Sequence, residues 1–135
     1  MIKNKIAIIC AEFNEEITSV MLESAKKEAL RQNLEVVQII KVPGAFDIPY
    51  AAKKVIELKK ADGIITLGAV IQGDTDHDII VADHCARLCA DLSVQYTIPI
   101  ALGVIGPRVT WENAEKRKEE YAIRAIIAVK KLLEL

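Results

Sequence analysis

The stretch GIITLGAVIQGDTDHD, residues 63–78, predicts a buried strand that runs directly into the start of a helix. Its first nine residues are almost all apolar, as expected of a parallel strand covered on both faces. Helical spacing follows over residues 77–96, and Gly73 lets the chain turn between the two elements. A strand joined so closely to a helix indicates an α/β protein built from strand–helix units.

Three further strand–helix units lie on either side of this one, each an apolar run followed by a segment with helical spacing. The predicted strands are 5–11, 35–42 and 99–104, and the helices are 15–32, 47–60 and about 111 to the end of the chain. Four such units predict one domain over residues 1–135, an α/β three-layer αβα sandwich. Right-handed crossovers favour a four-stranded parallel, flavodoxin-like sheet in the order 2-1-3-4.

Particular residues mark the ends of these elements. Asn14 and Thr110 each precede a helix and are placed to cap it. Gly106 and Pro107 follow the fourth strand and predict that the chain turns there.

Charge and apolar content limit the classes of partner. Eighteen Lys and Arg against nineteen Asp and Glu leave a net charge of −1, which excludes a global basic field for nucleic acid or an anionic membrane. The first apolar run covers only about six residues, too short for a signal peptide or membrane span.

Cys10, Cys85 and Cys89 lie in apolar runs and indicate reduced, buried thiols in a cytoplasmic protein. The 52% share of hydrophobic residues favours a homo-oligomer.

Ligands of doubly wound sheets bind beyond the carboxyl ends of the strands, so the corners there are candidate sites. Phe13, after the first strand, is either a staple for the next helix or a stacking surface. After the second strand, VPGAFDIP (residues 42–49) is either a rigid helix start capped by Asp47 or a loop in which Gly44 lets the backbone approach a ligand.

The third corner, GDTDHD (residues 73–78), combines an imidazole with a helix start. Helix N-termini attract anions, and a histidine can exchange protons near neutral pH. His77 therefore belongs either to an anion and proton site or to an ordinary exposed helical turn. At the fourth corner, Arg108 and Arg117 are either solvated side chains or the cation that a phosphate site requires.

Two kinds of metal site do not fit the sequence. The aspartates within residues 74–78 are spaced like the start of a calcium loop, but Ile79 and Cys85 occupy the places that need Gly and Glu. His77 and His84 lack zinc-ligand spacing with the two cysteines of the same helix. No metal is predicted.

Taken together, four stretches closely resemble the 6,7-dimethyl-8-ribityllumazine synthase family, in order along nearly the whole chain. They are AEFN (11–14), VPGAFDIP (42–49), GAVIQGDTDH (68–77) and the later Arg117. The compact length and the GP pair at 106–107 are more similar to archaeal members. The resemblance implies a transferase of riboflavin biosynthesis that needs no cofactor. It would condense 5-amino-6-(D-ribitylamino)uracil with 3,4-dihydroxy-2-butanone 4-phosphate to 6,7-dimethyl-8-ribityllumazine, phosphate and water.

The same resemblance implies a role for each candidate site residue. The aminouracil would contact Phe13, Ala45, Phe46, Asp47, Ala69, Val70, Ile71 and Leu102; the phosphate would contact Asp74, Thr75 and Arg117; and His77 would move the protons. Leu102 and Arg117 would reach in from the neighbouring subunit of a homopentamer, which in some members closes into an icosahedral shell of 60 subunits. Asp47 stands where many relatives have Glu, and Leu102 where bacterial relatives commonly have an aromatic residue.

Alternatives come from two classes. An archaeal-type riboflavin synthase is a paralogue of similar fold, although the GDTDH corner suits a phosphorylated substrate better. A non-catalytic flavodoxin-like binding or shell protein is the other alternative. A response regulator is disfavoured because Gly68 and Ala69 stand where its phospho-acceptor Asp would be.

Overall fold

The computed structural model describes residues 2–135, and along these residues strands and helices alternate. The strands are β1 (Asn4–Ala11), β2 (Leu34–Val42), β3 (Gly63–Ile71) and β4 (Ile100–Val109). The helices are α1 (Glu15–Arg31), a 3-10 turn η1 (Ala45–Asp47), α2 (Ile48–Leu58), α3 (His77–Tyr96) and α4 (Trp111–Leu133). The alternation is the one that the sequence predicts.

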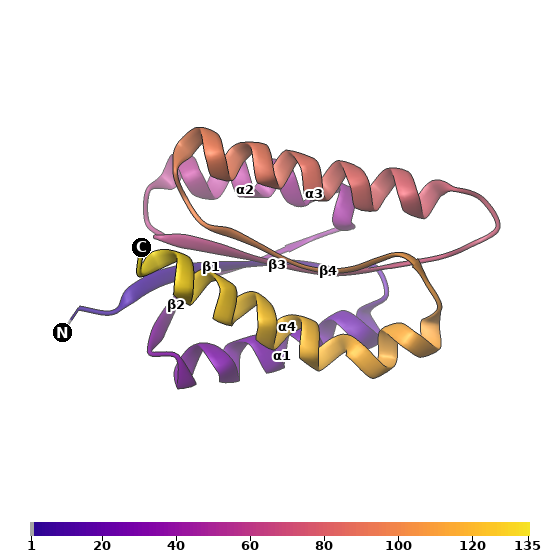
Figure 1. Ribbon diagram of the computed structural model, residues 1–135, viewed down its shortest axis with the longest axis horizontal. Coiled ribbons are helices and arrows are strands. Elements are labelled where there is room, and N and C mark those ends of the chain that lie inside the picture. Colours follow the sequence, from indigo (N-terminus) through magenta and orange to yellow (C-terminus); the bar gives the residue numbers. More distant parts are fainter. Residues whose placement is uncertain (1) are drawn as a thin grey trace.

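The four strands form one parallel sheet in the order β2-β1-β3-β4. Helices α1 and α4 pack together on one face, and α2 and α3 pack together on the other (Figure 1). The predicted three-layer flavodoxin-like α/β fold with order 2-1-3-4 is therefore confirmed.

The apolar runs are explained by a core on each face of the sheet. Alternate residues of β1 point to opposite faces, so that Ile6 and Ile8 pack beneath α1 and α4 while Ala7 and Ile9 pack beneath α2 and α3. All four are fully buried. A strand segment covered on both sides is apolar on both faces, which is why residues 6–11 of β1 lack the alternation of a half-exposed strand. Within residues 2–135, no helix combines the length and apolar character needed to cross a membrane.

The three cysteines are free and buried, as the sequence predicts. Burial raises the pKa of the Cys10 thiol, and a hydrogen bond with Cys89 together with burial raises the pKa of Cys85. Cys10 packs in the α1 side of the core, whereas Cys85 and Cys89 pack on the α3 side. The thiols serve as small core residues.

The end of β4 differs from the prediction. Strand pairing does not stop before Gly106 and Pro107 but continues to Val109, whose carbonyl oxygen accepts a hydrogen bond from the backbone N–H of Gln72 at 2.9 Å. The register with β3 shifts between Ala69 and Ile71, so β4 holds extra residues there. The predicted turn is therefore wrong: positive φ angles at Gly106 (116°) and Arg108 (59°) absorb these residues as an irregularity within the strand.

The two predicted caps have different outcomes. Thr110 caps α4, because its side-chain oxygen accepts a hydrogen bond from the backbone N–H of Asn113 at 3.2 Å. Asn14 directly precedes α1, but its side chain makes no capping bond. Its left-handed backbone (φ 64°) differs from the extended one of ordinary caps, and its amide instead donates to the Ala69 carbonyl oxygen.

Candidate active site

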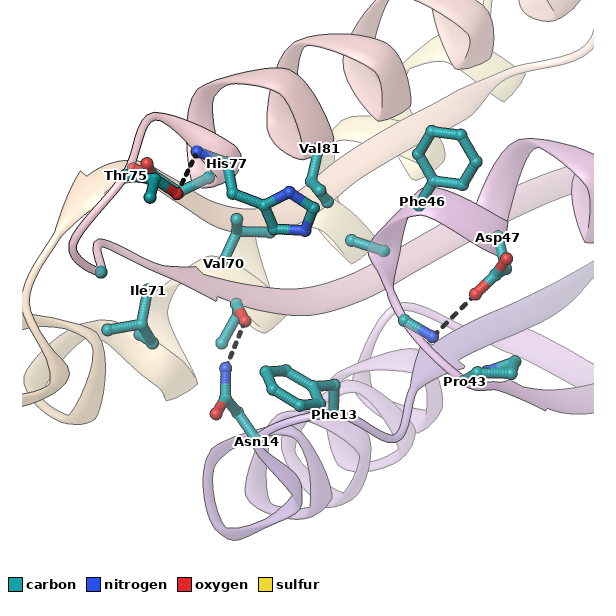
Figure 2. Close-up of a pocket in the computed structure, with 15 residues that line it drawn as sticks. Phe13, Asn14, Pro43, Phe46, Asp47, Val70, Ile71, Thr75, His77 and Val81 are labelled. Carbon is teal, nitrogen blue, oxygen red and sulfur yellow. Dashed lines mark hydrogen bonds between the residues drawn. The ribbon is translucent and has the colours of Figure 1, made fainter.

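A cavity of about 420 Å³ lies at the carboxyl ends of β1, β2 and β3 (Figure 2). Doubly wound sheets bind ligands at this edge, where the strand order reverses. Its lining residues come from the loops that follow these three strands and from the start of α3: Phe13, Asn14, Pro43, Gly44, Ala45, Phe46, Asp47, Ala69, Val70, Ile71, Gly73, Thr75, His77, Asp78 and Val81.

The corner after β1 supplies an exposed aromatic ring. Phe13 is 71% exposed, which is too open for a ring that packs against the following helix as a hydrophobic staple. The backbone N–H of Phe13 donates to the Pro43 carbonyl oxygen at 3.0 Å, which ties the first corner to the second. The ring is thus held at the cavity with a face free for stacking on a planar ligand.

The corner after β2 is closed by two hydrogen bonds between the same two residues. The backbone N–H of Gly44 donates to Oδ2 of Asp47, and the backbone N–H of Asp47 donates to the Gly44 carbonyl oxygen, both at 3.0 Å. Capping of α2 by Asp47, one of the two interpretations of this loop, is not observed, because its side chain makes no bond into that helix. Its carboxylate rigidifies the loop instead.

The corner after β3 brings backbone groups, a hydroxyl and an imidazole together. Ala69, Val70 and Ile71 form the cavity wall as β3 ends. The backbone N–H of His77, the first residue of α3, donates to Oγ1 of Thr75 at 3.3 Å. The Thr75 hydroxyl keeps its own hydrogen for another acceptor. Figure 2 shows the His77 ring at the cavity that Phe13 lines from the β1 corner.

Asn14 and Asp78 also contribute to the site, and sequence reasoning gave neither of them such a role. Asn14 lines the cavity and bonds to Ala69. Asp78 is buried beside His77, and its Oδ2 accepts a hydrogen bond of 2.9 Å from the backbone N–H of Arg108. This bond fixes the irregular end of β4 against the first turn of α3. Acidic residues are common in the first turn of a helix because they interact favourably with the helix dipole. The sequence around Asp78 therefore does not distinguish that common role from the bond to Arg108.

Three predicted site residues lie outside this cavity. Asp74 is exposed in the turn before α3. Leu102 is 48% exposed and lines a separate groove of about 270 Å³ between α3 and β4. Arg117 lies on α4, on the other face of the sheet, where its guanidinium pairs with Oε2 of Glu120 at 3.6 Å. The remaining predicted residues, Phe13, Ala45, Phe46, Asp47, Ala69, Val70, Ile71, Thr75 and His77, are brought together around the cavity.

The charges at the cavity leave one requirement unmet for a phosphate ligand. No Lys or Arg is among the described residues that line the cavity, although the N-terminus of α3 lies at its wall. Within residues 2–135, no three His, Cys, Asp or Glu side chains are grouped so that they could hold a metal ion. The chain alone therefore offers a stacking ring, backbone hydrogen-bonding groups, a helix N-terminus and a proton-transfer side chain.

Comparison with known proteins connects this arrangement to one enzyme family. The family model for 6,7-dimethyl-8-ribityllumazine synthase matches residues 3–135. The 6,7-dimethyl-8-ribityllumazine synthase of Methanobrevibacter smithii is 48% identical over 132 residues, which cover 98% of this chain and 95% of that protein. That of Saccharolobus islandicus is 48% identical over 130 residues (96% and 84%), and that of Metallosphaera sedula is 45% identical over 128 residues (95% and 85%). This chain belongs to the 6,7-dimethyl-8-ribityllumazine synthase family.

Proposed function

We propose that this protein is a transferase of riboflavin biosynthesis that forms 6,7-dimethyl-8-ribityllumazine. Its substrates are 5-amino-6-(D-ribitylamino)uracil and 3,4-dihydroxy-2-butanone 4-phosphate, and its other products are phosphate and water. The observation that carries this proposal is the meeting of Phe13, Asp47 and His77 at one cavity in a chain that matches the family over residues 3–135. The alternatives, an archaeal-type riboflavin synthase and a non-catalytic flavodoxin-like protein, find no support in these similarities.

The aminouracil occupies the wide part of the cavity. Its pyrimidine ring stacks on Phe13, whose ring is exposed there. Backbone groups of residues 69–71 read the polar edge of the uracil, and the loop 45–47 holds the ribityl chain. Asp47 uses Oδ2 on Gly44, so its Oδ1 is the oxygen that faces a ribityl hydroxyl.

The phosphate of the second substrate binds at the N-terminus of α3. Backbone N–H groups at a helix N-terminus attract anions, and the Thr75 hydroxyl and the Asp74 backbone add donors. The cation comes from Arg117 of a neighbouring subunit, because no Lys or Arg among the described residues lines the cavity of one chain.

His77 carries the protons of the reaction. The amine of the aminouracil forms an imine with the ketone and releases one water, phosphate is then eliminated, and the second ring closes with loss of a second water. Each step needs a proton at a defined atom and two reactants held in place, so orientation and general acid–base catalysis account for the rate. A histidine beside the phosphate site supplies both directions of proton transfer, and no cofactor takes part.

The active unit is a homopentamer of one-domain subunits in the cytoplasm, with the option of closure into an icosahedral shell. Leu102 and Arg117 complete the site of the adjoining copy. The exposure of Leu102 and Arg117 on one chain and the 52% hydrophobic content support this arrangement. Light scattering on the purified protein distinguishes a pentamer from a 60-subunit shell.

The function is tested by mixing purified protein with both substrates and following lumazine formation optically. We expect a rate clearly above the spontaneous condensation in a protein-free control. A trace that matches the control overturns the proposal. A second arm offers lumazine alone, and appreciable riboflavin in that arm favours the paralogous synthase instead.

A further inference from the structure

Two aromatic rings join the loop after β2 to helix α3. The Phe46 and His84 rings are stacked, with centroids 4.0 Å apart and planes inclined by 13°. Phe46 is the middle residue of η1, and His84 lies two helical turns after His77. The stack therefore links a wall of the cavity to the helix that carries the proton-transfer residue.

The hydrogen bonds of this loop hold its backbone and not the Phe46 ring, and one of them joins the Pro43 carbonyl oxygen to the Phe13 N–H. Its hydrogen bonds between Gly44 and Asp47 are internal, and Ala45 is buried in the core below. Phe46 is 52% exposed, and in Figure 2 its ring points away from Phe13. A ring this exposed has several accessible rotamers unless a neighbour selects one of them. The imidazole of His84 is that neighbour.

Phe46 also forms part of the boundary between two hollows. It lines the 420 Å³ cavity and an adjoining groove of about 520 Å³ beside α2 and α3, which His84 lines as well. His84 does not line the first cavity. It therefore acts on a ligand there only through Phe46, as a positioning residue and not as a catalytic one.

We propose that His84 positions the PGAFD loop (residues 43–47) through its stack with Phe46 and so sets the affinity for the ribityl end of the aminouracil. This inference rests on the proposed function. The stack fixes the Phe46 side chain, and the backbone on either side of it carries Ala45 and Asp47. Loss of the stack should weaken the binding of one substrate only, because the phosphate site and His77 lie at the other end of the cavity.

The test compares His84→Ala with His84→Phe in steady-state lumazine formation. We expect His84→Ala to raise the KM for the aminouracil by about two- to tenfold, the range of an aromatic pair, with kcat and the KM for the butanone phosphate unchanged. His84→Phe should restore the KM because it restores a stacking ring. Arg87→Ala is the matched control, because Arg87 is an exposed residue one turn further along α3. It should leave kcat and both KM values unchanged. Circular dichroism verifies that each variant is folded.

A reciprocal variant separates positioning from general loss of structure. In a Phe46→Leu background, His84→Ala should have no further effect on the KM, since the partner ring is already absent. An unchanged KM in His84→Ala, a failure of His84→Phe to restore it, or additive effects in the double variant each overturns the inference. A wild-type protein without lumazine formation instead overturns the proposed function, and this is seen before any variant is assayed. The ring-current shift of the His84 protons, lost in Phe46→Leu, reports the stack independently of turnover.

Discussion

The side-chain amide of Asn14 donates a 2.8 Å hydrogen bond to the carbonyl oxygen of Ala69, which is 55 residues further along the chain. Ala69 is the last fully paired residue of β3 before the register with β4 shifts, and it is 4% exposed. The bond therefore orients the peptide that leads into Val70, at the wall against which the uracil is proposed to lie.

Replacing Asn14 with Gly should remove this bond without straining the left-handed backbone at that residue. We expect a loss of about 1 kcal/mol in the free energy of unfolding, measured by urea denaturation, together with a higher KM for the aminouracil. Asn33→Gly is the matched control, because Asn33 has a similar φ of 59° at the end of α1, away from the cavity. Equal KM values for the two variants would contradict the role given to Asn14.

His77→Ala should reduce turnover more than binding. If His77 moves the protons, kcat should fall by about 10²-fold, a typical contribution of general acid–base catalysis, while both KM values change little. His84→Ala is the control, since it also removes a histidine from α3 but should leave kcat intact. Unchanged turnover in the His77 variant removes this residue from the mechanism.

Arg117→Ala should weaken binding of the butanone phosphate. Losing a charged hydrogen bond to the phosphate should raise its KM by about tenfold or more, with a smaller change in the KM for the aminouracil. Arg124→Ala is a matched control on the same helix, because Arg124 pairs with the same Glu120 oxygen, at 3.7 Å against 3.6 Å for Arg117. A larger effect at Arg124 than at Arg117 would transfer the phosphate role to Arg124.

Gly106→Ala should destabilise the fold. Gly106 has a φ of 116°, and a Cβ atom there would collide with the carbonyl oxygen of Val70. Backbone strain alone should cost about 1 to 3 kcal/mol, measured by thermal or urea unfolding. Gly73→Ala serves as the comparison, since a Cβ at Gly73 meets nothing within 4 Å, and its stability should stay within about 0.5 kcal/mol of wild type. Similar losses in both variants would argue against this explanation.

Much of the fold follows from local patterns in the sequence. Residues 6–11 are apolar at every position because this part of β1 is covered on both faces. The capping of α4 by Thr110 is also local, because the capping bond spans only three residues. Such features are encoded within a few neighbouring residues. They make strands, helices and the location of their loops predictable.

Several of the exceptions depend on partners that are distant in the chain. Asn14 bonds to Ala69 and not to its own helix, and the N–H of Arg108 is held by Asp78, 30 residues earlier. Gly106 suits a turn by its chemistry, yet it lies inside β4, between Ile105 and Val109, the residues that pair with Ala69 and Ile71 of β3. For Leu102 and Arg117 the proposed partner is on another subunit, so neither the sequence pattern nor one folded chain brings them to the cavity.

The extra residues in β4 have a consequence for the solubility of the protein. β4 is an edge strand, and a regular edge presents a row of free N–H and C=O groups that a foreign strand could extend. The left-handed backbone at Gly106 and Arg108 interrupts that row, and Pro107 between them has no N–H to offer. The same irregularity that brings β4 against Val70 therefore guards this edge against edge-to-edge aggregation.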